Sequence, residues 1–335
     1  MMEAERQKLL VVEDLCKEYL SRQKKNGQHR TVKAVDHASF SVLRGETFGI
    51  VGESGCGKTT LGKCVVRLHE PTSGSMYFDK DGSMQDILKL SREDSFQMRQ
   101  KLQIVFQDPY ASLNPMHNIL EAFDEPLRIH GFGGKAERKE IVAEMLRTVN
   151  LQPDYMYRYP HEFSGGQRQR ICIAKALALK PDLIVCDEPV SALDVSIQAQ
   201  ILNLMKKLQR EFGLSYIFIA HDLSVVQYMS DHIAVMYLGK IVEIGEAGAL
   251  YQNSLHPYTR ALLSAVPTPV YGQKKQRVVL GGDVPSPLNP PAGCRFHTRC
   301  EHCMEICRHT EPQLRPAGDG EHMVACHLYQ QNGDV

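Results

Sequence analysis

The sequence predicts an α/β fold whose core is built around a phosphate-binding loop, and two stretches carry this prediction. "FGIVGESGCGKTTLGKCVVRL", from Phe48, is an apolar strand followed by a glycine-rich loop and the start of a helix. "PDLIVCDEP", from Pro181, is a short apolar run that ends in two adjacent acids, as expected for a second core strand. A strand, a loop and a helix in this order are the setting in which such a glycine pattern binds phosphate.

Composition limits the class of protein. The chain has 335 residues, a length that predicts about two domains. Lys plus Arg and Asp plus Glu both number 39, so no overall positive field would hold the chain on nucleic acid, and we expect no nucleic-acid partner. The charged start and the absence of any apolar stretch of ~20 residues predict a soluble cytoplasmic chain that is at most docked on a membrane.

The first stretch contains the pattern G-x-x-x-x-G-K-[ST]. Gly52 and Gly57 allow the loop to wrap around phosphate, and its N–H groups and the helix N-terminus face the anion. Lys58 is expected to reach the β and γ oxygens, and the Thr59 hydroxyl to ligate Mg²⁺. Cys56 is interpreted as a small filler rather than a redox switch. The other loop residues expected to contact the nucleotide are Ser54, Gly55, Cys56 and Thr60.

The two acids of the second stretch are expected to have different roles. Neighbouring side chains on a strand point to opposite sides. Asp187 would hold the Mg²⁺ shell, and Glu188, just past the strand end, would polarise the attacking water. An acidic pair that simply begins a helix is the alternative.

Between these stretches, "FSGGQRQRICIAKALALKPD" opens a helix at Ser164, Gly165 and Gly166 and presents free N–H groups, either to an anion or within an ordinary capped helix. With "GESGCGKTT", "FQDPYASLNP", "FSGGQ", "CDEPVSALD" and "IFIAHD" in this order, the chain resembles an ABC-transporter ATPase subunit. The resemblance implies a P-loop core with an antiparallel β subdomain and a helical subdomain at about residues 110–160.

The resemblance also implies roles for further residues. Tyr19 matches the aromatic that stacks on adenine, with a half-buried strand tyrosine as the alternative. Gln107 matches the glutamine that touches the Mg²⁺ shell and leads into the helical subdomain that meets the membrane subunits. His221 matches the switch histidine on the γ-phosphate, and Asp194 the segment that couples two sites across a dimer. The residues that would cap ATP held by the other protomer are Ser164, Gly165, Gly166 and Gln167.

The C-terminal part of the sequence indicates a particular group within the ABC-transporter ATPases. "HPYTRALLSAVP" and "PSPLNPPAGCRFHTRC" are similar to the ATPase subunits of oligopeptide, dipeptide and nickel importers. This implies a second related ATPase subunit, two permeases and an extracytoplasmic solute-binding protein, with the chain on the cytoplasmic face of the membrane. Residues 1–250 would form the nucleotide-binding domain and residues 251–335 an extension. The single set of motifs and the lack of heptads argue against translation and DNA-repair ATPases.

Cys294, Cys300, Cys307 and Cys326 follow the spacing C-x5-C-x6-C-x18-C. Four thiolates suit a 4Fe-4S cluster, zinc being the alternative and free thiols the third reading. The resemblance favours the cluster, and Cys303 is an extra thiol that these relatives usually lack. A structural role is preferred to redox sensing, since an extension with few apolar residues buries little core; an iron–sulfur redox-sensing ATPase is the competing function. Histidines of the extension are further candidate ligands, most of them expected to face solvent: 297, 302, 309, 322 and 327.

Overall fold

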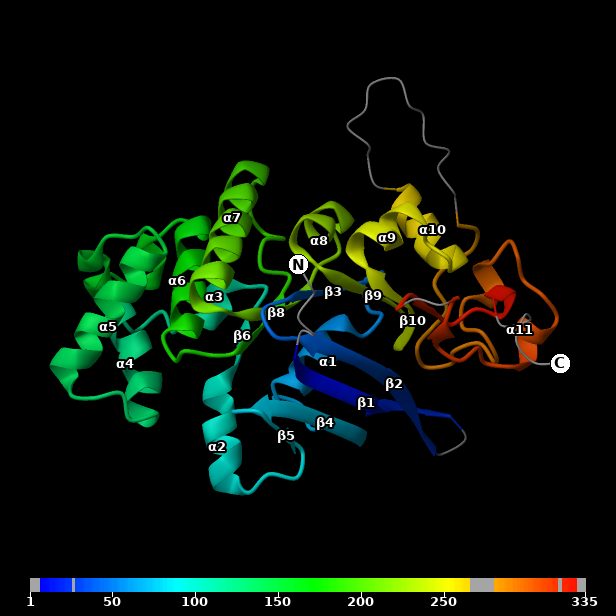
Figure 1. Ribbon diagram of the computed structural model, residues 1–335, viewed down its shortest axis with the longest axis horizontal. Coiled ribbons are helices and arrows are strands. Elements are labelled where there is room, and N and C mark those ends of the chain that lie inside the picture. Colours follow the sequence, from blue (N-terminus) through cyan, green and yellow to red (C-terminus); the bar gives the residue numbers. More distant parts are fainter. Residues whose placement is uncertain (1–6, 26–27, 266–279, 319–320, 330–335) are drawn as a thin grey trace.

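The computed structural model describes residues 7–25, 28–265, 280–318 and 321–329. Its central sheet is eight-stranded, with the order β11-β12-β10-β9-β3-β8-β7-β6 (Figure 1). The strands are β3 (Thr47–Val51), β6 (Leu102–Val105), β7 (Leu183–Asp187), β8 (Ser215–Ile219), β9 (His232–Tyr237), β10 (Lys240–Glu246), β11 (Arg315–Pro316) and β12 (Met323–Val324).

Five neighbouring strands, β9, β3, β8, β7 and β6, are parallel. β3, β7 and β8 are buried at every position, which explains why they read as continuous apolar runs. Their carboxyl ends lie at one edge of the sheet, where open α/β sheets bind ligands. The two stretches that predicted the fold, at β3 and β7, therefore end at the same edge.

A second, antiparallel sheet has the order β2-β1-β4-β5. Its strands are β1 (Lys8–Lys25), β2 (Gln28–Leu43), β4 (Ser73–Lys80) and β5 (Ser83–Asp86). Buried side chains from this sheet, from α1 (Lys58–Val65) and from the central sheet form one hydrophobic cluster. This confirms the predicted antiparallel subdomain. β1 and β2 pair as a long hairpin across the basic segment 21–30, for which the sequence predicts a hairpin tip; residues 26–27 lie outside the described residues.

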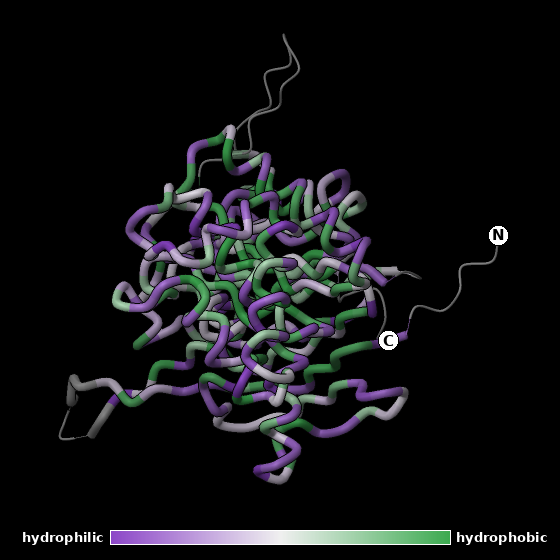
Figure 2. Tube along the Cα trace, turned by 90° about the vertical axis from the view of Figure 1, so that its left-hand side faces the viewer, coloured by the Kyte–Doolittle hydropathy of each residue, from purple (hydrophilic) through white to green (hydrophobic). Residues whose placement is uncertain are grey.

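Apart from α1 and α2, which pack on the side of the antiparallel sheet, helices cover the other face of the central sheet and extend to one end of the molecule (Figure 1). α4 begins with a capping box in which Asn118 and Glu121 satisfy each other's backbone N–H groups. Hydrophobic segments lie inside and hydrophilic ones outside (Figure 2). The helices up to α8 are α2 (Arg92–Lys101), α3 (Pro109–Ser112), α4 (Ile119–Ile129), α5 (Lys135–Thr148), η1 (Pro153–Tyr157), η2 (Pro160–Glu162), α6 (Gly165–Leu177), α7 (Val195–Phe212) and α8 (Leu223–Met229).

The C-terminal segment lies at the opposite end from α4 and α5 (Figure 1). Residues 250–267 predict a helical segment, and their described part ends α9 and forms α10. Residues 268–293 are rich in Pro and Gly and predict an extended connection, of which residues 268–279 lie outside the described residues. The remaining short helices are α9 (Ala247–Gln252), α10 (Pro257–Ser264), η3 (His297–Arg299), α11 (Ile306–His309) and η4 (His327–Tyr329). Within the described part of the chain, no helix has both the length and the apolarity that crossing a membrane requires.

The expectation that this segment buries little core is wrong. β12 pairs with β10, so Met323 and Val324 add to the central sheet. Phe296 is 1% exposed and joins the main hydrophobic cluster, packing on Tyr237 and Tyr258 at ring-centroid distances of 5.3 and 5.4 Å. A few large side chains at the right places attach the extension to the core even though its composition is polar.

Candidate nucleotide-binding site

The glycine-rich loop joins β3 to α1 at the carboxyl edge of the sheet. Gly57 has φ +110°, and a Cβ there would lie 2.0 Å from the Ala34 carbonyl oxygen. Only glycine fits this conformation and this approach. Lys58 is 5% exposed, and its Nζ donates to the carbonyl oxygens of Gly52, at 2.7 Å, and Glu53, at 3.1 Å. The lysine is thus held across the loop with its charge at the phosphate position.

A cavity of about 380 Å³ opens over this loop. Nine of the predicted site residues line it: Ser54, Gly55, Gly57, Lys58, Thr59, Thr60, Gln107, Glu188 and His221. Its lining also includes residues that the sequence did not indicate: Val32, Lys33, Ala34, Leu238, Gly239 and Pro287. No local motif marks this second group, because β2, the β9–β10 turn and the C-terminal extension reach the cavity only through the tertiary fold.

The two acids at the end of β7 do face different partners. The Thr59 hydroxyl donates to Asp187 Oδ1 at 2.9 Å, and burial raises the pKa of Asp187. Glu188 has φ +48°, in the left-handed region, so the chain turns between the two residues. The Gln107 amide donates to Glu188 Oε2 at 2.8 Å, and His221 Nδ1 lies 3.2 Å from the same oxygen. Three predicted residues from separate loops therefore meet at one carboxylate.

Tyr19 and Cys56 lie beside the cavity rather than in its lining. Tyr19 is 36% exposed, lies close to Thr60, and pairs across the β1–β2 ladder with Val32, a lining residue. Cys56 is 4% exposed, and burial raises the pKa of its thiol. A buried, protonated thiol is poorly reactive, which agrees with its interpretation as a filler.

The predicted residues at the start of α6 lie outside this cavity. Ser164 Oγ accepts from the Gln167 N–H at 3.3 Å, and Gln167 Oε1 accepts from the Ser164 N–H at 3.0 Å, which makes a capping box. A Cβ on Gly166 would lie 2.6 Å from Cγ2 of Ile197 in α7. Asp194 is the N-cap residue of α7. Within one chain, this group forms a separate surface from the phosphate loop.

The fold brings the four spaced cysteines together. Cys294, Cys300, Cys307 and Cys326 line one small pocket, and Cys303 is not among its lining residues. Burial raises the pKa of Cys294 to about 12 and of Cys326 to about 11. Among the described residues, the one group of three or more candidate ligands within 4.8 Å of one another is Cys16, Asp36 and His37, so no three of these sulfurs are that close.

The histidines of the extension differ from expectation. His302 and His309 are exposed, but His327 is 6% exposed and its Nε2 lies 3.0 Å from the Thr310 carbonyl oxygen. His322 Nε2 lies 2.7 Å from Glu243 Oε1, and His297 is half-buried. The expectation that most face solvent is wrong, because the attachment of β12 to β10 covers part of the segment.

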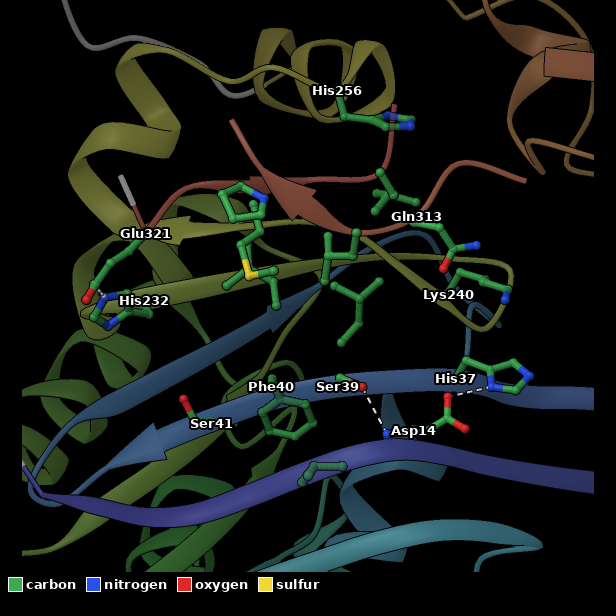
Figure 3. Close-up of a pocket in the computed structure, with 18 of the residues that line it drawn as sticks. Asp14, His37, Ser39, Phe40, Ser41, His232, Lys240, His256, Gln313 and Glu321 are labelled. Carbon is green, nitrogen blue, oxygen red and sulfur yellow. Dashed lines mark hydrogen bonds and ion pairs between the residues drawn. The ribbon is translucent and has the colours of Figure 1, made fainter. Parts of the chain in front are cut away.

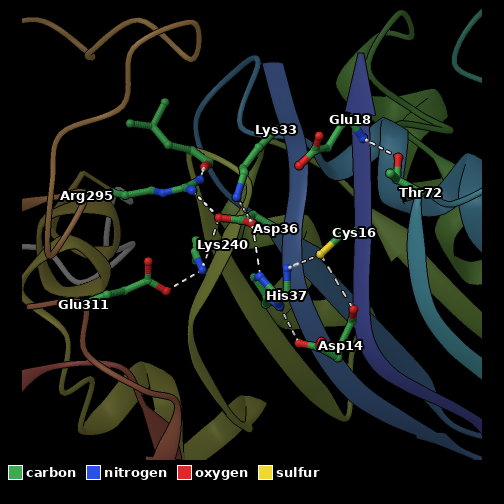
Figure 4. A network of polar contacts seen from close by, with 11 residues as sticks. Asp14, Cys16, Glu18, Lys33, Asp36, His37, Thr72, Lys240, Arg295 and Glu311 are labelled. Atoms are coloured by element: carbon green, nitrogen blue, oxygen red, sulfur yellow. Dashed lines mark hydrogen bonds and ion pairs between the residues drawn. The ribbon is translucent and has the colours of Figure 1, made fainter. Parts of the chain in front are cut away.

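A second cavity and a group of three candidate metal ligands lie outside the predicted nucleotide site. A cavity of about 640 Å³ lies between β1–β2 and the β10–β12 region, with Asp14, His37 and Lys240 at its rim (Figure 3); it contains none of the predicted nucleotide residues. Asp36, in the Cys16–Asp36–His37 group, also pairs with Lys33, Lys240 and Arg295 (Figure 4). Burial alone raises the pKa of Asp36, but these cations lower it overall, so its charge is already neutralised without a metal.

Comparison with known proteins then identifies the family. Residues 35–191 match the family described as "ABC transporter", and residues 242–307 match "Oligopeptide/dipeptide transporter, C-terminal region". The chain is 53% identical over 307 residues to "Putative oligopeptide transport ATP-binding protein YkfD" of Bacillus subtilis (strain 168), covering 91% of this chain and 92% of that protein. The chain belongs to the ABC-transporter ATP-binding family. It is an ATPase, and ATP with Mg²⁺ is its expected ligand, so the resemblance carried by the five motifs is confirmed.

Two further proteins are similar to this ABC ATPase over most of its length. It is 47% identical over 326 residues to "Dipeptide transport ATP-binding protein DppF" of Escherichia coli (strain K12), covering 97% of this chain and 96% of that protein. The structure titled "Dimeric structure of a post-hydrolysis state of the ATP-binding cassette MJ0796 bound to ADP and Pi" matches with a TM-score of 0.61 and 27% identity, over 71% of this chain and 99% of that chain. The predicted fold class is therefore confirmed for the cassette.

Proposed function

We propose that this ABC ATPase is the ATP-hydrolysing subunit of a heteromeric importer of dipeptides or oligopeptides, bound peripherally at the cytoplasmic face of the cell membrane. The observation that carries the proposal is the match of residues 242–307 to the C-terminal region of oligopeptide/dipeptide transporters. Relatives named for oligopeptide and dipeptide transport support it over the length of the chain. In this proposal, residues 1–250 form the nucleotide-binding domain, with a helical subdomain at about 110–160, and residues 251–335 form the extension.

The geometry of the site supports the roles that we propose for its residues. The phosphate loop and Lys58 bind the phosphates, with Tyr19 beside the adenine. Mg²⁺ would be held by Thr59, Asp187 and, through its shell, Gln107, and would neutralise charge that develops on the phosphates. Glu188 orients the attacking water, because its carboxylate faces the cavity between Gln107 and His221.

Two protomers are needed for a complete site in this proposal. Ser164, Gly165, Gly166 and Gln167 would cap the γ-phosphate of ATP bound by a second, related ATPase subunit, and Asp194 would couple the two sites. The dimeric cassette with ADP and Pi that resembles this chain supports the arrangement. Closure on ATP and reopening after hydrolysis would then move two permeases that receive solute from an extracytoplasmic binding protein.

Transport tests the proposal directly. The chain, its second ATPase subunit and the permeases are reconstituted in vesicles with the solute-binding protein. We expect di- or oligopeptides to stimulate ATP hydrolysis and to accumulate on the side away from the binding protein. If nickel or another small solute stimulates ATP hydrolysis and peptides do not, the transported substrate is that solute and not a peptide. If the rate of ATP hydrolysis changes with the oxidation state of the cluster and with no added solute, the result would support the redox-sensing ATPase.

We also propose that Cys294, Cys300, Cys307 and Cys326 hold a 4Fe-4S cluster. Their position around one pocket supports a shared ligand. A tetrahedral zinc ion with Zn–S of about 2.3 Å would bring its sulfurs to about 3.8 Å from one another. Among the described residues, no three cysteine sulfurs lie within 4.8 Å of one another, so the four thiols do not already have the spacing of a zinc site.

Metal analysis tests this second proposal. We expect about four iron and four sulfide per chain after anaerobic purification, and their loss in Cys300→Ser. Cys303→Ser is the matched control, because Cys303 lies outside the pocket lining, and it should keep the iron. Zinc in both proteins, or no metal in a folded active ATPase, would contradict the cluster and leave the ATPase proposal intact.

A further inference from the structure

The C-terminal extension contacts the phosphate loop directly. Arg299 donates from Nη1 to Glu53 Oε2 at 2.8 Å and from Nη2 to Glu53 Oε1 at 3.1 Å. Glu53 is the second residue of "GESGCGKTT", so this bidentate pair holds the loop itself. The backbone N–H of Glu53 donates to the Tyr258 hydroxyl at 2.9 Å. One loop residue is therefore held from two sides, by η3 and by α10.

These contacts are partly buried, and Tyr258 packs among aromatic rings. The side chain of Arg299 is 7% exposed and that of Glu53 26%, and Tyr258 is fully buried. Tyr258 packs on Tyr237 at 4.7 Å between ring centroids and on Phe296 at 5.4 Å. A bidentate arginine–carboxylate pair in such surroundings has a fixed geometry, unlike an exposed ion pair between long side chains.

A second connection runs from the same segment to the other end of the loop. Arg295 donates to the Leu238 carbonyl oxygen and pairs with Asp36 (Figure 4). The neighbouring Gly239 N–H donates to the Cys56 carbonyl oxygen at 2.7 Å. The extension also contributes Pro287 to the lining of the nucleotide cavity. Both ends of the phosphate loop are thus linked to residues 287–299.

The loop needs such support, because its backbone has positive φ at Gly52, Gly55 and Gly57 and must hold its N–H groups toward the phosphates. We propose that Arg299 and Tyr258 are positioning residues for the phosphate loop, so that the C-terminal extension sets the affinity of the chain for ATP. The proposal rests on the proposed function, in which ATP binds at this loop. Neither residue lines the nucleotide cavity, so each acts through Glu53.

A binding titration of the full chain tests the proposal, with a fluorescent ATP analogue and Mg²⁺ as the probe. We expect Arg299→Ala and Glu53→Gln each to weaken binding roughly 3–30-fold, the usual range for residues that act through a neighbour. Arg299→Lys should lie between wild type and Arg299→Ala, because one charge remains without the bidentate geometry. The double variant should bind about as weakly as either single variant, since both remove the same contact.

Arg308→Ala is the matched control. Arg308 also adjoins a cysteine of the extension, but it makes an exposed pair with Glu305, and its loss should leave affinity within about 2-fold. If Arg299→Ala does not fold, Tyr258→Phe and Glu53→Gln are used in its place. For these variants we expect a higher KM for ATP and a nearly unchanged kcat. Wild-type affinity in these variants, or an equal loss in Arg308→Ala, would overturn the proposal. Lys58→Ala tests separately whether ATP binds at the phosphate loop. Loss of binding in this variant supports the proposed function, whereas unchanged binding would contradict it.

Discussion

At the scale of single residues, the site depends on one change of backbone direction. The strand β7 ends at Asp187, and the left-handed conformation of Glu188, with φ +48°, turns its side chain toward Gln107 and His221. A non-glycine residue in this region carries a conformational cost and is more often found where function requires it. The position of Glu188 therefore agrees with a role for its carboxylate in hydrolysis.

Glu188→Gln should retain ATP binding and lower hydrolysis roughly 10²–10⁴-fold, the scale of losing a general base. The amide is nearly the same size but cannot accept a proton from water. ATP turnover of the assembled complex and ATP affinity are measured side by side. Glu140→Gln, at an exposed pair on α5, is the control and should leave turnover unchanged. Near-normal turnover in Glu188→Gln would remove Glu188 from this role.

His232 gives a pH dependence of stability whose sign can be worked out. Its hydrogen bond to the buried Glu46 carboxylate raises the pKa of His232 above the usual value of about 6.5. A base whose pKa is raised by folding stabilises the folded state below the pKa of the unfolded chain, and this contribution is lost as pH rises through the folded pKa. In urea unfolding between about pH 6 and pH 8, wild type should lose stability relative to His232→Gln. Parallel curves for the two proteins would refute this contribution.

At the scale of elements, the contact between α6 and α7 explains a glycine in the "FSGGQ" motif. Gly166 faces Ile197 so closely that a Cβ would lie 2.6 Å from Cγ2 of a β-branched side chain. The motif is therefore constrained by packing as well as by any contact with ATP. Its second glycine keeps the start of α6 close against α7.

Gly166→Ala should lower the free energy of unfolding by about 1–3 kcal/mol, the usual cost of overpacking. The better helix propensity of alanine offsets only part of this cost. Gly134→Ala is the control, since a Cβ there meets nothing within 4 Å, and it should change stability by no more than about 0.5 kcal/mol. Chemical denaturation of both variants decides the point, and equal stabilities would show that α6 and α7 can adjust.

At the scale of the whole molecule, the predicted ATP-contacting residues form two separate groups. One group surrounds the phosphate loop, and the other lies at the start of α6 and outside the cavity over that loop. In the proposed function, these two groups are half-sites that belong to different ATP sites. This separation is what a site shared between two protomers requires.

Ser164→Ala should leave the ATP affinity of the isolated chain within about 2-fold of wild type and lower hydrolysis by the assembled complex on the order of 10²-fold, as for other lost charge-stabilising donors. The lost N-cap would cost about 1 kcal/mol of stability, which thermal unfolding monitors separately. Weaker ATP binding by the isolated chain would place Ser164 in its own site and contradict the shared arrangement.

The core strands, the phosphate loop and the two acids could be predicted from the sequence, because continuous apolar runs and glycine spacing are local signals. The five motifs and their order indicated the family. The sequence also indicated the four spaced cysteines, without their ligand.

The way in which the extension packs on the cassette became apparent from the three-dimensional structure alone. Phe296 and Tyr258 are far apart in the chain and pack together only because the extension folds back beside β9. The pairing of Arg299 with Glu53 spans 246 positions, and although each residue lies in a recognisable motif, neither motif indicates that the two pair. The attachment of the extension to the phosphate loop could not be read from the sequence, because long-range contacts depend on how the elements pack and leave no periodicity in the chain.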